Sequence, residues 1–181
     1  MIVKETKLKG CFIIEPTVFK DSRGYFFESF NQKTFNKLTN QKVNFVQDNE
    51  SFSSKGVLRG LHYQTGDDAQ AKLVRVIKGR VLDIAVDLRR GSDTFGEYEA
   101  LEMTEDNKMQ LFIPRGFAHG FVVLSDTAIF SYKCDNFYNK GSEDGIIYND
   151  NHLNIDWKLP EEELLISEKD LVLPTLKDAK L

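Results

Sequence analysis

Alternation of apolar and polar residues is the dominant pattern along this chain. The segment VLDIAVDL (81–88) puts four aliphatic residues on one face of a predicted strand, and a mixed set with Asp83 and Asp87 on the other. An acidic face is expected to border a polar cavity or to lie in solvent, because an unpaired buried carboxylate is costly. Residues 72–79 repeat the pattern and end in Lys78-Gly79, which predicts a tight turn and a hairpin with 81–88.

The same period predicts further strands at roughly 8–12-residue spacing. They are expected over residues 10–19, 24–30, 43–49, 56–64, 97–103, 110–114, 119–125 and 128–134. Helix signals are few: Asn31 can cap a short helix over 32–38, and Pro160 with the acids after it favours a helical turn within 159–167. Many short strands separated by turns predict an all-β sandwich or barrel with a few short helices.

Size and composition indicate one globular domain over residues 1–181, since the chain has no linker, repeat or low-complexity segment. The net charge of −4 argues against nucleic acid or an anionic membrane as the main partner. No run approaches the ~20 apolar residues of a membrane span, and the N-terminus lacks the apolar stretch of a signal peptide. Cys11 and Cys134 are too few and too far apart for a disulfide framework or a zinc site. We therefore expect a reduced, cytoplasmic protein.

Four basic residues lie in the predicted strands or beside them: Arg23, Arg59, Lys72 and Arg75. Each one alone is typical of a solvated face. Gathered on one cavity, they would suit an anionic ligand, because arginine binds phosphate through paired hydrogen bonds. His62, within RGLHYQ, interrupts an apolar run, so it is either a structural histidine or a group that faces a ligand.

The segment IPRGFAHGF (113–121) contains the spacing Pro114-x-Gly116-x-x-His119, which resembles the second motif of the cupin jelly rolls. A metal-binding cupin also needs an H-x-H pair and a glutamate a few residues later, whereas this chain has His62-Tyr63-Gln64. The chain has only three histidines, which make a poor metal-ligand set. The pattern therefore favours a cupin-like jelly roll without a metal.

Five segments closely resemble the dTDP-4-dehydrorhamnose 3,5-epimerase family, and the resemblance extends from about residue 8 to residue 176. They are DSRGYFFE (21–28), QDNESFSSKGVLRGLHYQ (47–64), AQAKLVRVIKGRVLDIAVDLRRGS (69–92), NKMQLFIPRGFAHGF (107–121) and SEKDLVLP (167–174). RGLHYQ followed by AQAKLVRV is the specific combination. The resemblance implies a jelly-roll homodimer that acts on dTDP-4-dehydro-6-deoxy-D-glucose. It would invert carbons 3 and 5 to make dTDP-4-dehydro-L-rhamnose, a precursor for surface polysaccharide, without a cofactor or metal.

The resemblance also implies a set of catalytic roles. His62 would be the base, a role that suits histidine because its unperturbed pKa is near ~6.5. Asp170 would orient His62, and Asp83 on its predicted strand is the local rival for that role. Tyr132 would be the acid on the opposite face of the sugar, and Lys72 would stabilise the enolate at the carbon 4 oxygen.

Eleven positions match substrate-contacting positions of the family. They are Arg23, Phe26, Glu28, Gln47, Asn49, Arg59, Lys72, His119, Tyr138, Glu143 and Lys169. Arg59 and Lys169 would suit the pyrophosphate, and Tyr138 would stack on the thymine ring. By resemblance, the segment around Arg23 to Glu28 would reach the site of the partner subunit. The loops TGDDAQAK (65–72) and GSEDG (141–145) depart from the family pattern, which leaves the sugar and nucleotide preference open.

Three alternatives stay open. A related epimerase that acts at carbon 3 only would use the same base, acid and lysine. A metal-dependent cupin oxygenase would need the H-x-H pair that this chain lacks. A catalytically silent sugar-nucleotide-binding cupin would be expected to have lost its base or its acid. Because His62, Lys72, Tyr132 and Asp170 are all present, double epimerisation is favoured.

Overall fold

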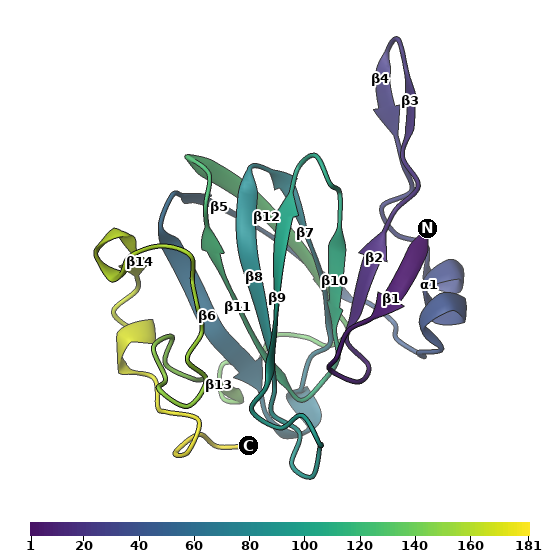
Figure 1. Ribbon diagram of the computed structural model, residues 1–181. Coiled ribbons are helices and arrows are strands. Elements are labelled where there is room, and N and C mark those ends of the chain that lie inside the picture. The colour runs from purple at the N-terminus through teal and green to yellow at the C-terminus, as the bar shows by residue number, and fades with distance from the viewer.

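The computed structural model, which describes residues 1–181, contains two six-stranded sheets that face each other (Figure 1). The first sheet has the order β1 (Ile2–Glu5), β2 (Phe12–Glu15), β10 (Gln110–Ile113), β7 (Lys72–Lys78), β12 (Thr127–Cys134) and β5 (Gln47–Ser54). The second has β13 (Glu143–Gly145), β6 (Val57–Gln64), β11 (Phe117–Val123), β8 (Arg80–Asp87) and β9 (Tyr98–Thr104), with β14 (Leu165–Ile166) paired to β6. From β5 to β8 the chain changes sheet at every strand, and it does so again from β9 to β13. This arrangement confirms the predicted all-β jelly roll.

The helices are short, as expected. Helix α1 (Gln32–Thr39) begins where Asn31 Oδ1 accepts a hydrogen bond from the Thr34 N–H at 3.0 Å, so the predicted cap is confirmed. The 3-10 helices are η1 (Gly66–Asp68), η2 (Glu161–Glu163) and η3 (Asp170–Val172). The turn expected within 159–167 is η2, and the chain then continues as strand β14. None of the helices is long and apolar enough to span a membrane.

The predicted hairpin between 72–79 and 81–88 is wrong. Strand β7 pairs with β10 and β12 in one sheet, whereas β8 pairs with β9 and β11 in the other. Gly79, with φ +82°, turns the chain from one sheet to the other. The alternating pattern could not distinguish a hairpin from two consecutive strands in different sheets. The alternation of apolar and polar residues within a strand is the same whether the next strand pairs with it or lies in the opposite sheet.

Both faces of β8 are buried. The aliphatic face packs outward against residues 146–176 of the C-terminal segment, including Tyr148 and Trp157. The mixed face points into the core between the sheets, where Val81 and Ala85 lie. Asp83 and Asp87 are both fully buried, so an acidic face in solvent is excluded.

The two buried acids are held differently. Asp83 bonds to His119 beside the inner cavity described below. Burial alone would raise the pKa of Asp87, but hydrogen bonds from Arg89, Ser92 and Thr94 outweigh it and lower the pKa to about 2. Asp87 is therefore a structural anion at the end of β8.

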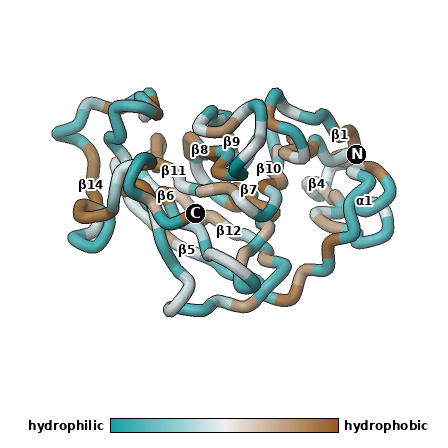
Figure 2. The backbone as a smooth tube through the Cα atoms, turned by 90° about the horizontal axis from the view of Figure 1, so that it is seen from below, coloured by the Kyte–Doolittle hydropathy of each residue, from teal (hydrophilic) through white to brown (hydrophobic).

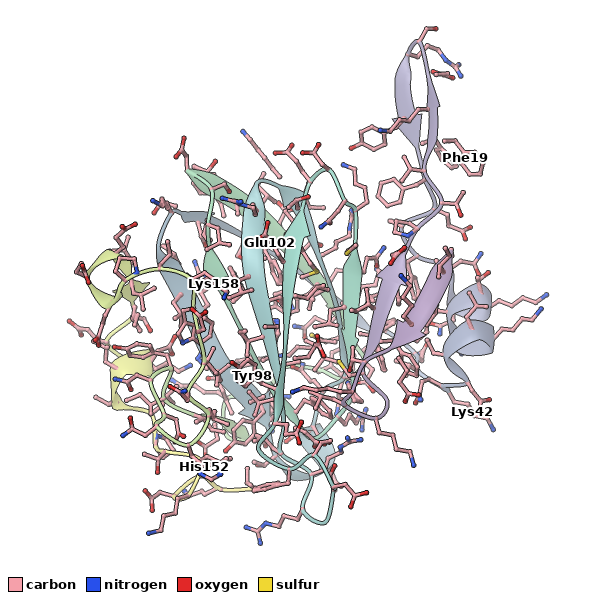
Figure 3. The ribbon with its side chains drawn as sticks, viewed as in Figure 1. Phe19, Lys42, Tyr98, Glu102, His152 and Lys158 are labelled. Atoms are coloured by element: carbon pink, nitrogen blue, oxygen red, sulfur yellow. The ribbon has the colours of Figure 1, made fainter.

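Strands β3 (Phe19–Asp21) and β4 (Gly24–Phe26) form a two-stranded arm that projects from the body (Figures 1 and 3). Its aromatic side chains are exposed, with Phe19 at 63%, Tyr25 at 57% and Phe26 at 71%. The single strands expected over 10–19 and 24–30 are therefore interrupted, and only parts of them are extended and paired. Figure 2 shows hydrophobic positions within the strands and hydrophilic backbone along many connections.

Two glycines with the same φ of +82° have different surroundings. A methyl group at Gly79 would meet the Thr127 carbonyl oxygen at 2.1 Å, whereas one at Gly91 would meet nothing within 4 Å. We expect Gly91→Ala to cost about 1–2 kcal/mol of unfolding free energy, from the left-handed backbone alone. Gly79→Ala should cost a further ~1–3 kcal/mol from the clash. Urea unfolding of both variants measures the difference, and equal losses would contradict the steric explanation.

Candidate active site

A cavity of about 770 Å³ lies between the two sheets and the C-terminal segment. Its lining includes seven of the residues predicted from the sequence: Arg59, His62, Lys72, His119, Tyr132, Lys169 and Asp170. A second cavity of about 290 Å³ shares His62, Lys72 and Tyr132 with the first. It adds Gln47, Asn49, Tyr138 and Glu143 from the predicted substrate contacts. Residues from distant parts of the chain therefore converge on one pair of adjoining cavities.

An irregularity in the β6–β11 pairing brings Arg59 and His62 to the same cavity. In a regular strand, residues three positions apart point to opposite faces. Here the register shifts between the His119–His62 pair and the Phe121–Arg59 pair. Gly60 permits this, since it has φ +124° and a methyl group there would lie 2.6 Å from the Gly120 Cα.

His62 is paired with Asp170. Its Nε2 lies 2.7 Å from Asp170 Oδ1, and the Asp170 residue is only 3% exposed. Burial alone would raise the pKa of Asp170, but the hydrogen bond and charge of His62 and the Gly60 N–H outweigh it and lower the pKa. Asp170 therefore stays ionised and fixes the imidazole ring, which leaves Nδ1 as the free ring nitrogen.

Asp83 is paired with His119 and not with His62. Its Oδ2 lies 2.9 Å from His119 Nε2, and both residues are buried. Burial lowers the pKa of His119 more than the contact with Asp83 raises it, so His119 is neutral at pH 7. The geometry thus contains two separate His–Asp pairs, and it favours Asp170 over Asp83 as the partner of His62.

Lys72 and Tyr132 lie on the opposite wall, in the first sheet. Burial lowers the pKa of Lys72, which has no carboxylate in ion-pair contact, and its Nζ is 6.0 Å from the Tyr132 ring centre. Burial raises the pKa of Tyr132, so its hydroxyl is protonated, and it makes no hydrogen bond within the chain. The cavity therefore has a histidine–carboxylate pair on one wall, and on the other a phenol donor and a lysine side chain without a carboxylate partner.

Comparisons with known proteins show to which family the chain belongs. The family model described as dTDP-4-dehydrorhamnose 3,5-epimerase matches residues 5–178. The chain belongs to this epimerase family. It is 51% identical to the dTDP-4-dehydrorhamnose 3,5-epimerase of Salmonella typhimurium, over 100% of this chain and 98% of the relative. The family members are isomerases, and so is this chain.

Two solved structures of the family are especially similar to this chain. The dTDP-4-dehydrorhamnose 3,5-epimerase from Elizabethkingia anophelis NUHP1 has a TM-score of 0.95 and 60% identity, and the match covers 98% of this chain and 97% of that one. A dTDP-6-deoxy-D-glucose-3,5-epimerase from Legionella pneumophila, in complex with dTDP-4-keto-L-rhamnose, has a TM-score of 0.94 and 47% identity. That match covers 98% of this chain and 93% of the other.

In this chain, several of the predicted substrate-contacting residues contact one another. Glu143 Oε2 accepts hydrogen bonds from the Tyr138 hydroxyl at 3.0 Å and from Lys169 Nζ at 2.7 Å. Gln47 accepts from the Tyr138 N–H at 3.1 Å and donates to Asn49 Oδ1 at 3.1 Å. Burial would raise the pKa of Glu143, but Lys169 and Tyr138 outweigh it and lower the pKa. Glu143 is therefore an anion with two partners.

Three predicted contacts lie away from both cavities of this chain. Arg23 and Phe26 are in the exposed β3–β4 arm, where Arg23 pairs with Asp21. Glu28 follows the arm and accepts a hydrogen bond from Asn31. None of the three lines either cavity within one chain.

Sequence reasoning missed Ser51 and the segment Leu164–Ser167, which also line the larger cavity. The Ser51 hydroxyl oxygen is buried and has no hydrogen-bond partner. A signal for Ser51 was available, because Gln47, Asn49 and Ser51 alternate along β5. For Leu164–Ser167 no local signal exists.

No group of three or more His, Cys, Asp or Glu residues is arranged to hold a metal ion. The exposed His152 (Figure 3) lines neither cavity.

The depressed pKa of Asp170 predicts a pH-dependent contribution to stability. Because the pKa is lower in the folded state, Asp170 stabilises the fold above its ordinary pKa of 3.8, and this contribution is lost as the pH falls through the folded value. Asp170→Asn should therefore be less stable than the wild type at neutral pH, and the difference should narrow below pH 3.8. Thermal unfolding from pH 3 to 7 tests this, with the exposed Asp93→Asn as control. A constant difference would contradict the pairing with His62.

Proposed function

We propose that this protein converts dTDP-4-dehydro-6-deoxy-D-glucose into dTDP-4-dehydro-L-rhamnose by inverting carbons 3 and 5. The observation that carries the proposal is the placement of His62 and Tyr132 on opposite walls of one cavity. Inversion requires a proton to leave from one face of the sugar and another to arrive on the opposite face. Two groups on the same wall would return the proton to the face it left.

The proposed chemistry needs only the residues present. His62 Nδ1 takes the proton from the carbon beside the ketone, and the C–H electron pair moves to form an enolate. Asp170 stabilises the resulting imidazolium, and Lys72 stabilises the negative charge on the carbon 4 oxygen, for which a placed donor is typically worth ~3–4 kcal/mol of barrier. The Tyr132 hydroxyl then protonates the opposite face. No electrons are gained or lost, so the reaction calls for no redox cofactor.

Charge in the cavity supports a diphosphate substrate. Arg59 has no carboxylate partner, and its guanidinium donates only to Ser53 Oγ at 3.2 Å. Lys72 is likewise unpaired. Two basic side chains without a carboxylate partner, in one cavity of a protein with net charge −4, would favour an anionic ligand. Arg59 and Lys169 suit the pyrophosphate, and Tyr138 with its exposed ring suits the thymine.

The complete site belongs to a homodimer in this proposal. Exposed apolar groups of the arm suggest a protein partner, because Phe19, Tyr25 and Phe26 project into solvent in a single chain. The arm would extend into the site of the second copy and supply Arg23, Phe26 and Glu28 there.

Proton NMR of the protein with dTDP-4-dehydro-6-deoxy-D-glucose in deuterium oxide tests the function directly. Deuterium should enter at carbons 3 and 5, and reduction of the product should give dTDP-rhamnose. Exchange at carbon 3 alone would point to a mono-epimerase. No exchange, with dTDP still bound, would point to a binding protein.

Two substitutions separate the base from the acid. His62→Asn should lower exchange at both carbons by about 10²–10⁴-fold while dTDP binding persists. Tyr132→Phe should still exchange protons but should fail to invert, because the base remains and the acid is lost. NMR exchange rates and product configuration measure these effects. Normal product from Tyr132→Phe would mean that another group is the acid.

Mixing two inactive variants tests the shared site. A His62→Asn subunit retains Arg23, and an Arg23→Ala subunit retains His62. After unfolding and refolding together, a mixed dimer should contain one complete site, so activity should reappear that neither variant has alone. The same mixture without refolding is the control. A mixture that stays inactive would contradict an arm that acts in the partner subunit.

A further inference from the structure

Three side-chain contacts and one step along the backbone connect the proposed nucleotide end of the site to His62, the proposed base. The Tyr138 hydroxyl donates to Glu143, and Lys169 donates to the same carboxylate oxygen. The next residue along the backbone is Asp170, whose Oδ1 lies 2.7 Å from His62 Nε2. Each of these three side-chain contacts is 3.0 Å or shorter. Within this connection, Glu143 joins Tyr138 to Lys169.

Glu143 lies on a strand that is paired in the second sheet, whereas Asp170 lies on a short turn beside that sheet. Strand β13 pairs with β6, and Glu143 lies opposite Gln64 in that register. Asp170 instead begins a single 3-10 turn. Three features link this turn to the second sheet: the 2.7 Å contact of Asp170 with His62, the weak 3.4 Å hydrogen bond from the Gly60 N–H, and the two-residue strand β14. The Glu143–Lys169 ion pair is therefore an additional tie between this turn and the sheet that carries His62.

We propose that Glu143 is a positioning residue: through Lys169 it fixes the turn that holds Asp170 against His62. The inference deepens the proposed epimerase function and rests on it. Its physical basis is that small misplacement of a catalytic group lowers the rate strongly, although the ion pair itself is partly exposed and stabilises the fold little. Substitution of Glu143 should therefore lower kcat, and this loss should depend on the presence of Lys169.

Glu143→Gln isolates this role, because the amide oxygen still accepts from Tyr138 while the charge that holds Lys169 is lost. We expect kcat for epimerisation to fall by about ten- to a hundredfold, with the Kd of dTDP changed by less than about fivefold. In a Lys169→Met background, Glu143→Gln should cause no further loss of kcat. Lys4→Met serves as the matched control, since it breaks a 2.7 Å surface ion pair with Glu15 far from the cavities. Its kcat should equal that of the wild type.

Kinetics, calorimetric dTDP binding and melting temperature are measured on the wild type and all four variants. The proposal is overturned if the two losses multiply in the double variant, if the loss is confined to the Kd or KM, or if only the melting temperature falls. A wild type that neither binds dTDP nor exchanges protons would instead refute the epimerase function itself. An active wild type with an unaltered Glu143→Gln variant would refute only the positioning role.

Discussion

The hydrogen bond between Asp170 and His62 is the contact on which the candidate site depends, and it joins residues 108 positions apart. The carboxylate reaches His62 only because the C-terminal segment folds over the second sheet. That segment is held by apolar packing, since Tyr148 and Trp157 bury the aliphatic face of β8. Hydrophobic burial outside the barrel thus places a charged group inside it, where it has little access to water.

The cavity contains polar groups that lack the hydrogen-bond or ion-pair partners that buried polar groups have elsewhere in the fold. Lys72 is partly buried without a counter-ion, and the only two buried side-chain polar atoms without a hydrogen-bond partner are Ser51 Oγ and Asp83 Oδ1. Such groups cost free energy, because desolvation is not repaid by a partner. A stable protein tolerates a few of them where a ligand is to be bound, and both unpartnered atoms lie in or next to the wall of the cavity.

The regular parts of the structure could be predicted from the sequence, because alternation is a local property. Strands such as 81–88 and the cap at Asn31 were predicted correctly. Which sheet a strand joins is not local, and so the hairpin around Gly79 was predicted wrongly. Strand β5 (Gln47–Ser54) was predicted only as far as residue 49. Its inner face lines a cavity and is polar, so the strand lacks the alternation of apolar and polar residues on which the prediction relied. The choice between Asp83 and Asp170 stayed open in the pattern, because a partner 108 positions away leaves no local trace.

The alternation of strands between the sheets connects the fold to the chemistry. His62 lies on β6 in the second sheet, and Lys72 lies on β7 in the first, although only a short loop separates the two strands. Tyr132 joins Lys72 because β12 pairs with β7. A flat sheet would present all three groups to one side of a substrate. The jelly roll instead places His62 and Tyr132 on two facing walls of one cavity, so the proposed base and acid could act on opposite faces of a sugar bound between them.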